Sequence, residues 1–277
     1  RVSLLQLSWL LLAWGLAWWV FAWVSEIDRL FSGAAQSSAL LALAAACAAL
    51  AGWLAGRLRW AELGLASLLL VPAAWAILAG AAHALYQPAA AWGWLGWLAV
   101  GVVHMRNLRQ LATQLPGGAC SAAHVLGLWL LLLVPSLQLR YLLMQLAEQY
   151  NAWRWLGWAL LPSLYLLWVA RASRLPWPLA SYPREYRLWA AAPLAGLLLV
   201  WFWLANAFSA GNADPLPYLP LLNPLELGLL LALSGAALWA WQAGQAWNWP
   251  AALYRQGVQG VLGLSLFALA TAMVFRS

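Results

Sequence analysis

Charged residues are scarce in this chain of 277 residues, and lysine is missing altogether. Only 8% of the residues are charged and 66% are hydrophobic, whereas soluble domains carry about 25% charged residues. This composition excludes a soluble domain, because a soluble fold cannot bury so much apolar surface. All fourteen basic residues are arginines, which gives a formal net charge of +7. They stand at the ends of apolar runs rather than in clusters with aromatic residues, so we expect no nucleic-acid partner.

Residue types that carry chemistry are also rare. The only two cysteines are Cys47 and Cys120, which excludes a disulfide framework. Cys120 and His124 are four residues apart and His104 precedes the same predicted loop, but no fourth ligand or established zinc spacing accompanies them. We therefore predict no metal and no cofactor. Nucleophile-elbow, phosphate-loop and dinucleotide-binding motifs are absent from the sequence, so no catalytic residue is assigned.

Long apolar runs fill most of the chain. A helix needs about 20 apolar residues to cross the hydrocarbon core of a membrane, and only helices satisfy the backbone in runs of this kind. The sequence predicts an all-α polytopic transmembrane bundle with about nine spanning helices. These lie near 3–24, 38–56, 62–83, 90–105, 122–143, 154–171, 188–208, 225–243 and 258–275. Prolines at 72, 135 and 162 fall inside runs and predict kinks.

The predicted spans form a single domain over residues 1–277. We expect this domain to belong to a longer polypeptide, because the chain begins at Arg1 and enters an apolar run at once. The arginine-rich, lysine-free composition suggests a bacterium with a GC-rich genome.

Arginines distribute unevenly between the two sides of the predicted membrane. The side that holds the N-terminal end has ten of them, at positions 1, 57, 59, 106, 109, 171, 174, 184, 187 and 255. The opposite side has four, at positions 29, 140, 154 and 276. Because positive residues concentrate on the cytoplasmic side, we predict an inner-membrane protein whose N-terminal end is cytoplasmic.

The first apolar run has two further features. Trp9, Trp14 and Trp18 recur at helical spacing through the membrane, and we expect them to pack against a neighbouring helix. Ser25 and Asp28 have the cap-x-x-acid spacing of a helix start. This spacing predicts a separate short helix at the membrane surface after the first span.

A proline-punctuated polar segment precedes the eighth predicted span. Pro215, Pro217 and Pro220 favour an extended chain there. Asn223 then fits the N-cap of a helix, Pro224 fits its first position, and Glu226 fits the third position, from which its carboxylate could bond back to the cap. This interpretation needs no ligand.

A functional interpretation of the same region remains open. On this hypothesis a polar site at the outer face contains Arg140, Asn206, Asp214, Asn223 and Glu226. Arg140 lies at the outer end of a predicted span, where a buried arginine would indicate function. The alternative is that Arg140 extends to the interface.

Three segments carry a resemblance to a known family. They are residues 123–132, the proline-rich residues 217–226, and the end of the chain from Met273 to Ser277. Together they resemble the bacterial predicted membrane proteins called domain of unknown function 2339, with Glu226 where aspartate is expected in many members. The resemblance covers most of the chain, and it implies a bacterial inner-membrane protein but no activity and no catalytic residue.

The function expected from the sequence is a non-catalytic envelope protein. It would handle or transport a lipid or glycan, or act as a scaffold for other membrane proteins, with membrane lipids as its surroundings. The alternative is a membrane-embedded enzyme that acts on lipid-linked sugars at the outer face. In that alternative Arg140 would face a phosphate, and Asp214 or Glu226 would serve as the acid or base.

Overall fold

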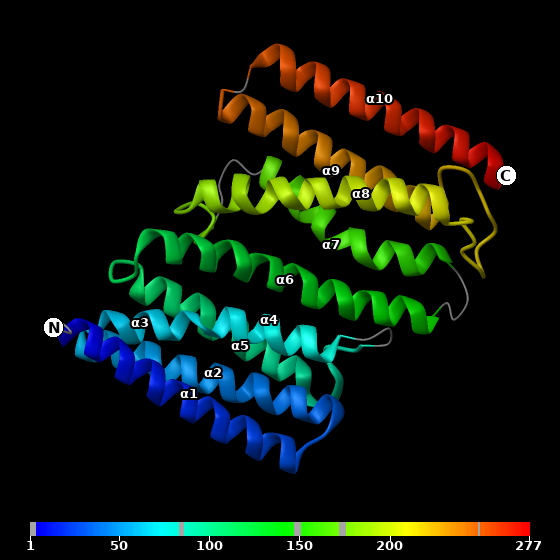
Figure 1. Ribbon diagram of the computed structural model, residues 1–277. Coiled ribbons are helices and arrows are strands. Elements are labelled where there is room, and N and C mark those ends of the chain that lie inside the picture. The colour runs from blue at the N-terminus through cyan, green and yellow to red at the C-terminus, as the bar shows by residue number, and fades with distance from the viewer. Residues whose placement is uncertain (1–3, 83–85, 147–150, 172–175, 249) are drawn as a thin grey trace. The chain divides into compact units, whose positions relative to one another are not determined.

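The computed structural model describes residues 4–82, 86–146, 151–171, 176–248 and 250–277, and helices dominate them (Figure 1). No strand occurs in these ranges; Ala213 and Leu216 form an isolated β-bridge. The helices are α1 (Leu4–Leu30), α2 (Gly33–Leu58), α3 (Ala61–Leu68), α4 (Leu70–Ala81), α5 (Gly93–Leu111), α6 (Gly117–Leu146), α7 (Asn151–Arg171), α8 (Ala191–Phe208), α9 (Pro224–Ala246) and α10 (Ala251–Arg276). A 3₁₀ turn, η1 (Ala90–Trp92), precedes α5, and a π-helix, η2 (Glu185–Ala190), precedes α8.

Over its described residues, each predicted span coincides with helical chain, which confirms the polytopic helical bundle. Residues 3 and 83, at the ends of two predicted spans, lie outside the described ranges. Within the described ranges, seven helices are long and apolar enough to cross a membrane. The predicted spans at 90–105 and 154–171 are α5 and α7, which fall outside these seven. Polar residues such as His104, Asn107 and Arg109 in α5, and Asn151 and Arg154 in α7, lower their hydropathy. The predicted count of nine is therefore approximate.

Packing contacts divide the chain into two compact units, Arg1–Leu130 and Leu131–Ser277. The boundary falls inside α6, so unit 1 contains α1 to α5 with the first part of α6, and unit 2 contains the rest of α6 with α7 to α10. The single domain over residues 1–277 stays a prediction.

Unit 1 is organised around α2, which packs against α3, α4 and α5. The face of α2 is rich in alanine and glycine, so neighbouring helices approach closely. At Gly52 the Asn107 side chain of α5 occupies the space of the absent Cβ, and its Nδ2 donates to the carbonyl of Ala48 at 2.9 Å. The separation of α3 from α4 falls at Leu69, three residues before Pro72, which cannot donate a helical hydrogen bond.

Helix α1 is one continuous helix through Leu30, so the prediction of a separate surface helix that starts at Ser25 is wrong. The cap-x-x-acid pattern lies inside the helix, where Glu26 instead pairs with Arg29 at 2.6 Å. The tryptophan prediction also differs in part from the structure. Trp14 and Trp18 are 67% and 55% exposed, and their rings meet edge to face at 5.9 Å. Trp9, 40% exposed, lines a space together with residues of α3, α4 and α6, which agrees with the prediction.

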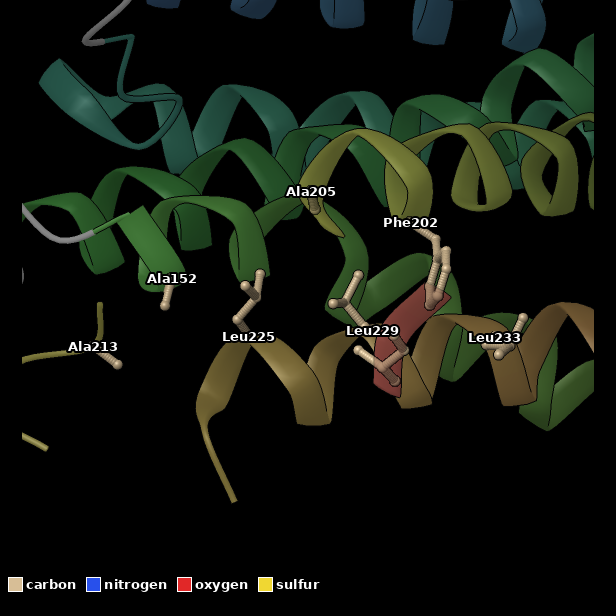
Figure 2. Close-up of a cluster of buried hydrophobic side chains, with 8 residues drawn as sticks. Ala152, Phe202, Ala205, Ala213, Leu225, Leu229 and Leu233 are labelled. Atoms are coloured by element: carbon tan, nitrogen blue, oxygen red, sulfur yellow. The ribbon is translucent and has the colours of Figure 1, made fainter. Parts of the chain in front are cut away.

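Unit 2 is built on α9, which packs against α7, α8 and α10. Figure 1 shows α8, α9 and α10 side by side. The apolar core of unit 2 joins these helices to the polar segment before α9 (Figure 2). The core residues are Ala152, Phe202, Ala205, Ala213, Leu225, Leu229, Leu233 and Leu269. Prolines 135 and 162 lie within the continuous helices α6 and α7.

Candidate functional site

Helix α9 begins as the sequence predicts. Asn223 is its N-cap, with φ −62° and ψ 135°, and Pro224 occupies the first helical position. The Asn223 side chain accepts a hydrogen bond from the Leu225 amide at 2.9 Å, and its Nδ2 donates to the carbonyl of Gly211 at 2.7 Å. Asn223 is 1% exposed, so the cap also fixes the preceding segment to the start of α9.

Glu226 does not make the capping contact that the sequence predicts. Its carboxylate does not return to the cap, because the Asn223 amide donates to the carbonyl of Leu219 instead. One carboxylate oxygen accepts from the Tyr218 hydroxyl at 2.5 Å, and the other accepts from the Leu221 amide at 2.6 Å. Leu221 has a φ of 69°, a left-handed conformation that costs a non-glycine residue about 1–2 kcal/mol. The bond to the Leu221 amide stabilises this turn.

Arg276, near the end of α10, faces the same carboxylate. Its Nη1 lies 4.0 Å from Glu226 Oε1, and the side chains are 6% and 0% exposed. Its Nη2 donates to the carbonyl of Asn206 at 2.5 Å and lies 3.3 Å from that residue's Oδ1, while its Nε donates to the carbonyl of Ser209 at 3.1 Å. The guanidinium thus binds the carbonyls that end α8 and pairs with the first turn of α9.

These residues form what we call the Glu226 cluster, namely Asn206, Tyr218, Asn223, Glu226 and Arg276. Burial and the hydrogen bond to the Glu226 carboxylate raise the pKa of Tyr218 to about 12, because both disfavour a second negative charge there. Tyr218 therefore stays a hydrogen-bond donor at neutral pH. Gly211, with a φ of +75°, packs beside it, and a Cβ there would lie 3.1 Å from Arg276 Cδ.

The structure brings three of the five predicted site residues together and leaves two apart. Asn206, Asn223 and Glu226 belong to the Glu226 cluster. The Asp214 side chain is exposed, and its carbonyl is 3.3 Å from the Trp153 indole nitrogen. Arg140 lies on α6, 8% exposed, with its guanidinium 5.3 Å from the centre of the Trp158 ring.

Arg140 lies where α6 and α7 pack closely. At Gly157 of α7 a Cβ would lie 2.5 Å from the Arg140 Cα, so only glycine permits this approach of the two helices. Arg140 is therefore buried at a close contact between α6 and α7. The described contacts join it to α7 and not to the Glu226 cluster.

The Glu226 cluster is suited to holding the chain rather than to catalysis. A general acid or base must reach its substrate within hydrogen-bond distance. Glu226 is fully buried and its two oxygens already accept from Tyr218 and Leu221. Asp214 is exposed and lies outside the cluster. The arrangement links the ends of α8, α9 and α10.

Potential metal ligands do not gather either. In the described ranges, no group of three or more histidine, cysteine or acidic residues could hold a metal ion. His104 and His124 are both buried, at 3% and 0% exposure, and the His104 ring lies in the space beside Gly127. His104 therefore lies where α5 packs on α6 within unit 1.

Unit 1 has apolar cavities beside α1. One cavity of about 600 Å³, here called the α2-side cavity, lies between α1, α2 and α4 and includes Ala44, Ala73 and Ile77 in its lining. A second cavity of about 730 Å³, the α6-side cavity, lies between α1, α3, α4 and the unit 1 part of α6. Both volumes are within the range of about 300–1,000 Å³ that small-molecule sites occupy.

The two cavities follow from how α1 sits on the unit. Ile27 is the only buried residue of α1 between residues 6 and 30. The facing part of α2 consists largely of alanine, whose short side chains leave space between the helices. The Trp19 indole crosses this space and donates to Cys47 Sγ at 3.2 Å.

Sequence reasoning missed Tyr218, Arg276 and the cavities. Tyr218 lies inside the proline-rich segment, eight residues before Glu226. This short separation in the sequence could have indicated that Tyr218 contacts Glu226. Arg276 is 50 residues from Glu226 in the sequence and has the position expected of an interface arginine, so no local pattern identifies its partner. For the cavities, the alanine run of α2 is the only sequence signal.

Comparisons with known proteins agree with the sequence resemblance. No curated protein and no solved structure matches this chain. The profile of the family described as Predicted membrane protein (DUF2339) matches residues 2–277. Two of the segments that carry the resemblance meet in the Glu226 cluster, because Arg276 of the last segment faces Glu226 of the proline-rich one. The chain therefore belongs to the DUF2339 family of predicted membrane proteins.

Proposed function

We propose that this protein is non-catalytic and binds the hydrocarbon chains of membrane lipids beside α1. The observation that carries the proposal is the pair of apolar cavities, of about 600 and 730 Å³, that flank a helix with one buried residue between positions 6 and 30. Side chains that line an empty cavity lack partner atoms on one side, so they lose van der Waals contacts. At the depth of the hydrocarbon core, lipid chains are the molecules that can supply them.

The lining of the α2-side cavity supports this choice of ligand. Alanine, leucine and isoleucine side chains form most of it, with few polar groups to select a glycan. Along α2 it extends from Gln36 to Ala51, a rise of about 22 Å at about 1.5 Å per residue. One leaflet of a hydrocarbon core of about 30 Å is about 15 Å thick, so the cavity is long enough for one lipid chain.

A catalytic role has less support from the geometry. The alternative of an enzyme for lipid-linked sugars needs Arg140 and an acid at one exposed site. Arg140 packs on Gly157, Glu226 is buried in its own cluster, and Asp214 is exposed elsewhere. A scaffold for other membrane proteins remains the alternative outcome of the test below.

The proposed setting is a bacterial inner membrane with the N-terminal end in the cytoplasm. The uneven arginine distribution supports this orientation. In unit 1, Arg57 lies in the last turn of α2 and Arg59 is its C-cap, whereas Glu26 and Asp28 stand at the end of α1. Reporter fusions after residues 31 and 59 would test the orientation, and they should lie outside and inside, respectively.

Retention of lipid by the purified protein tests the proposed function. We expect native mass spectrometry to detect lipid on the protein after mild detergent extraction. Ala44→Trp should lower the retained lipid because Ala44 lines the α2-side cavity. The control is Ala42→Trp, an exposed position on the same helix and outside the lining. A wild-type protein without lipid would overturn lipid binding and leave the scaffold role.

A further inference from the structure

The α2-side cavity has one polar end. Gln36 and Ser37, in the first turns of α2, line it there, while the remaining lining is almost entirely apolar. Gln36 Nε2 donates to Asp28 Oδ1 at 2.5 Å, and Asp28 is exposed in the last turn of α1. A carboxylate therefore stands at the polar end of an otherwise hydrocarbon-like space.

The charges around this end are not balanced. Arg29 pairs with Glu26 at 2.6 Å. The Asp28 carboxylate is not part of this ion pair, so it gives this end a net negative charge. The other described charged residues of unit 1 are Arg57, Arg59, Glu62, Arg106 and Arg109. They belong to the opposite end of the unit, because Gly96 of α5 packs on Leu41 of α2 while Asn107 packs on Gly52, so both helices run in the same direction.

We propose that the α2-side cavity binds a phospholipid whose headgroup carries a primary amine. This inference rests on the proposed lipid-binding function. One acyl chain lies between α1, α2 and α4, and the headgroup lies at Gln36 and Ser37. The ammonium group binds the Asp28 carboxylate, and the phosphate lies on the side of Arg29.

Charge complementarity selects this lipid over an anionic one. Glu26, Asp28 and Arg29 together carry a net charge of −1, which repels a headgroup that is negative overall. A zwitterionic headgroup with an ammonium group gains an attraction to Asp28 and keeps its phosphate near a guanidinium. A fatty acid would place its carboxylate beside Asp28 and is disfavoured for the same reason.

The test uses the protein in nanodiscs of equal parts phosphatidylethanolamine and phosphatidylglycerol. After transfer to detergent, native mass spectrometry identifies the lipid that remains bound. We expect bound phosphatidylethanolamine to exceed bound phosphatidylglycerol by about two- to fivefold, as for an exposed ion pair. Asp28→Asn should remove the enrichment and leave the total amount of bound lipid unchanged. Asp214→Asn, an exposed acid in unit 2, is the matched control and should behave as wild type.

The outcomes separate this inference from the function on which it rests. Absence of lipid from every preparation would overturn lipid binding itself. Bound lipid without amine enrichment, an enrichment that Asp28→Asn leaves intact, or bound fatty acid in place of phospholipid would overturn the headgroup assignment while lipid binding stands. Loss of enrichment in Asp28→Asn alone supports it.

Discussion

Replacement of Glu226 by alanine should destabilise unit 2 severely. The substitution removes the acceptor for the Tyr218 hydroxyl and the Leu221 amide and leaves the Arg276 guanidinium without its carboxylate. Breaking a buried ion pair by removing one partner costs about 3–5 kcal/mol. Both side chains are at most 6% exposed, so solvent screening reduces this cost little.

The stability loss can be measured by titration of the detergent-solubilised protein with SDS, followed by circular dichroism. Glu226→Ala should lower the free energy of unfolding by about 3–5 kcal/mol. Glu226→Gln should cost less, because the amide oxygen still accepts a hydrogen bond. The control is Glu26→Ala, which breaks an exposed pair with Arg29 and should cost at most about 1 kcal/mol.

A double variant then tests whether the pair acts as a unit. If Glu226 and Arg276 are coupled, Glu226→Gln with Arg276→Gln should cost less than the sum of the single changes, by about 0.5–3 kcal/mol. Strict additivity, or a Glu226→Ala loss no larger than that of Glu26→Ala, would refute the assignment of the cluster as a link between α8, α9 and α10.

Three further predictions concern individual positions. Asn223→Ala should lower the free energy of unfolding by about 1–3 kcal/mol through loss of the cap and of a buried bond, and Asn223→Asp should cost less because it keeps the cap; SDS titration measures both. Gly52→Ala should destabilise by about 1–3 kcal/mol because the Asn107 side chain must move, whereas Gly56→Ala, with open space around it, should not destabilise. Tyr218 has a raised pKa of about 12, so its stabilising contribution is complete below about pH 10, its ordinary pKa, and is lost as the pH rises toward 12. The stability difference between wild type and Tyr218→Phe should therefore be constant from pH 7 to about pH 10 and shrink above it.

Local sequence signals predicted the elements well. Apolar run lengths located the helices because the hydrocarbon core requires about 20 apolar residues per span. The start of α9 was predictable to the residue, since Asn223 and Pro224 satisfy requirements that depend only on adjacent backbone atoms. At Ser25 the same kind of signal was misleading. A cap-x-x-acid pattern also fits inside a helix, where Glu26 and Arg29 pair across one turn.

Contacts between distant residues were not predictable in the same way. The sequence spacing predicted a local partner for Glu226, namely the backbone of its own N-cap. Its interaction with Arg276, 50 residues away, had no sequence signature. The tertiary structure favours Tyr218 and Leu221 as its partners, because the proline-rich segment turns back over the start of α9. The packing of Arg140 on Gly157 is a further contact that only the three-dimensional arrangement reveals.

The two units use their few polar groups in opposite ways, and this difference argues for where function resides. In unit 2 the buried Glu226 and Arg276 pair with each other, and they fix three helix ends against the apolar core around Leu225 and Leu229. In unit 1 the charge at Asp28 stays exposed beside a cavity, and α1 has one buried residue, Ile27, between positions 6 and 30. Rigid, mutually satisfied groups stabilise a fold, whereas a loosely packed helix with space beneath it can take up a ligand. Lipid binding is therefore expected to respond to changes along α1 and α2, and the Glu226 cluster to affect it only through overall stability.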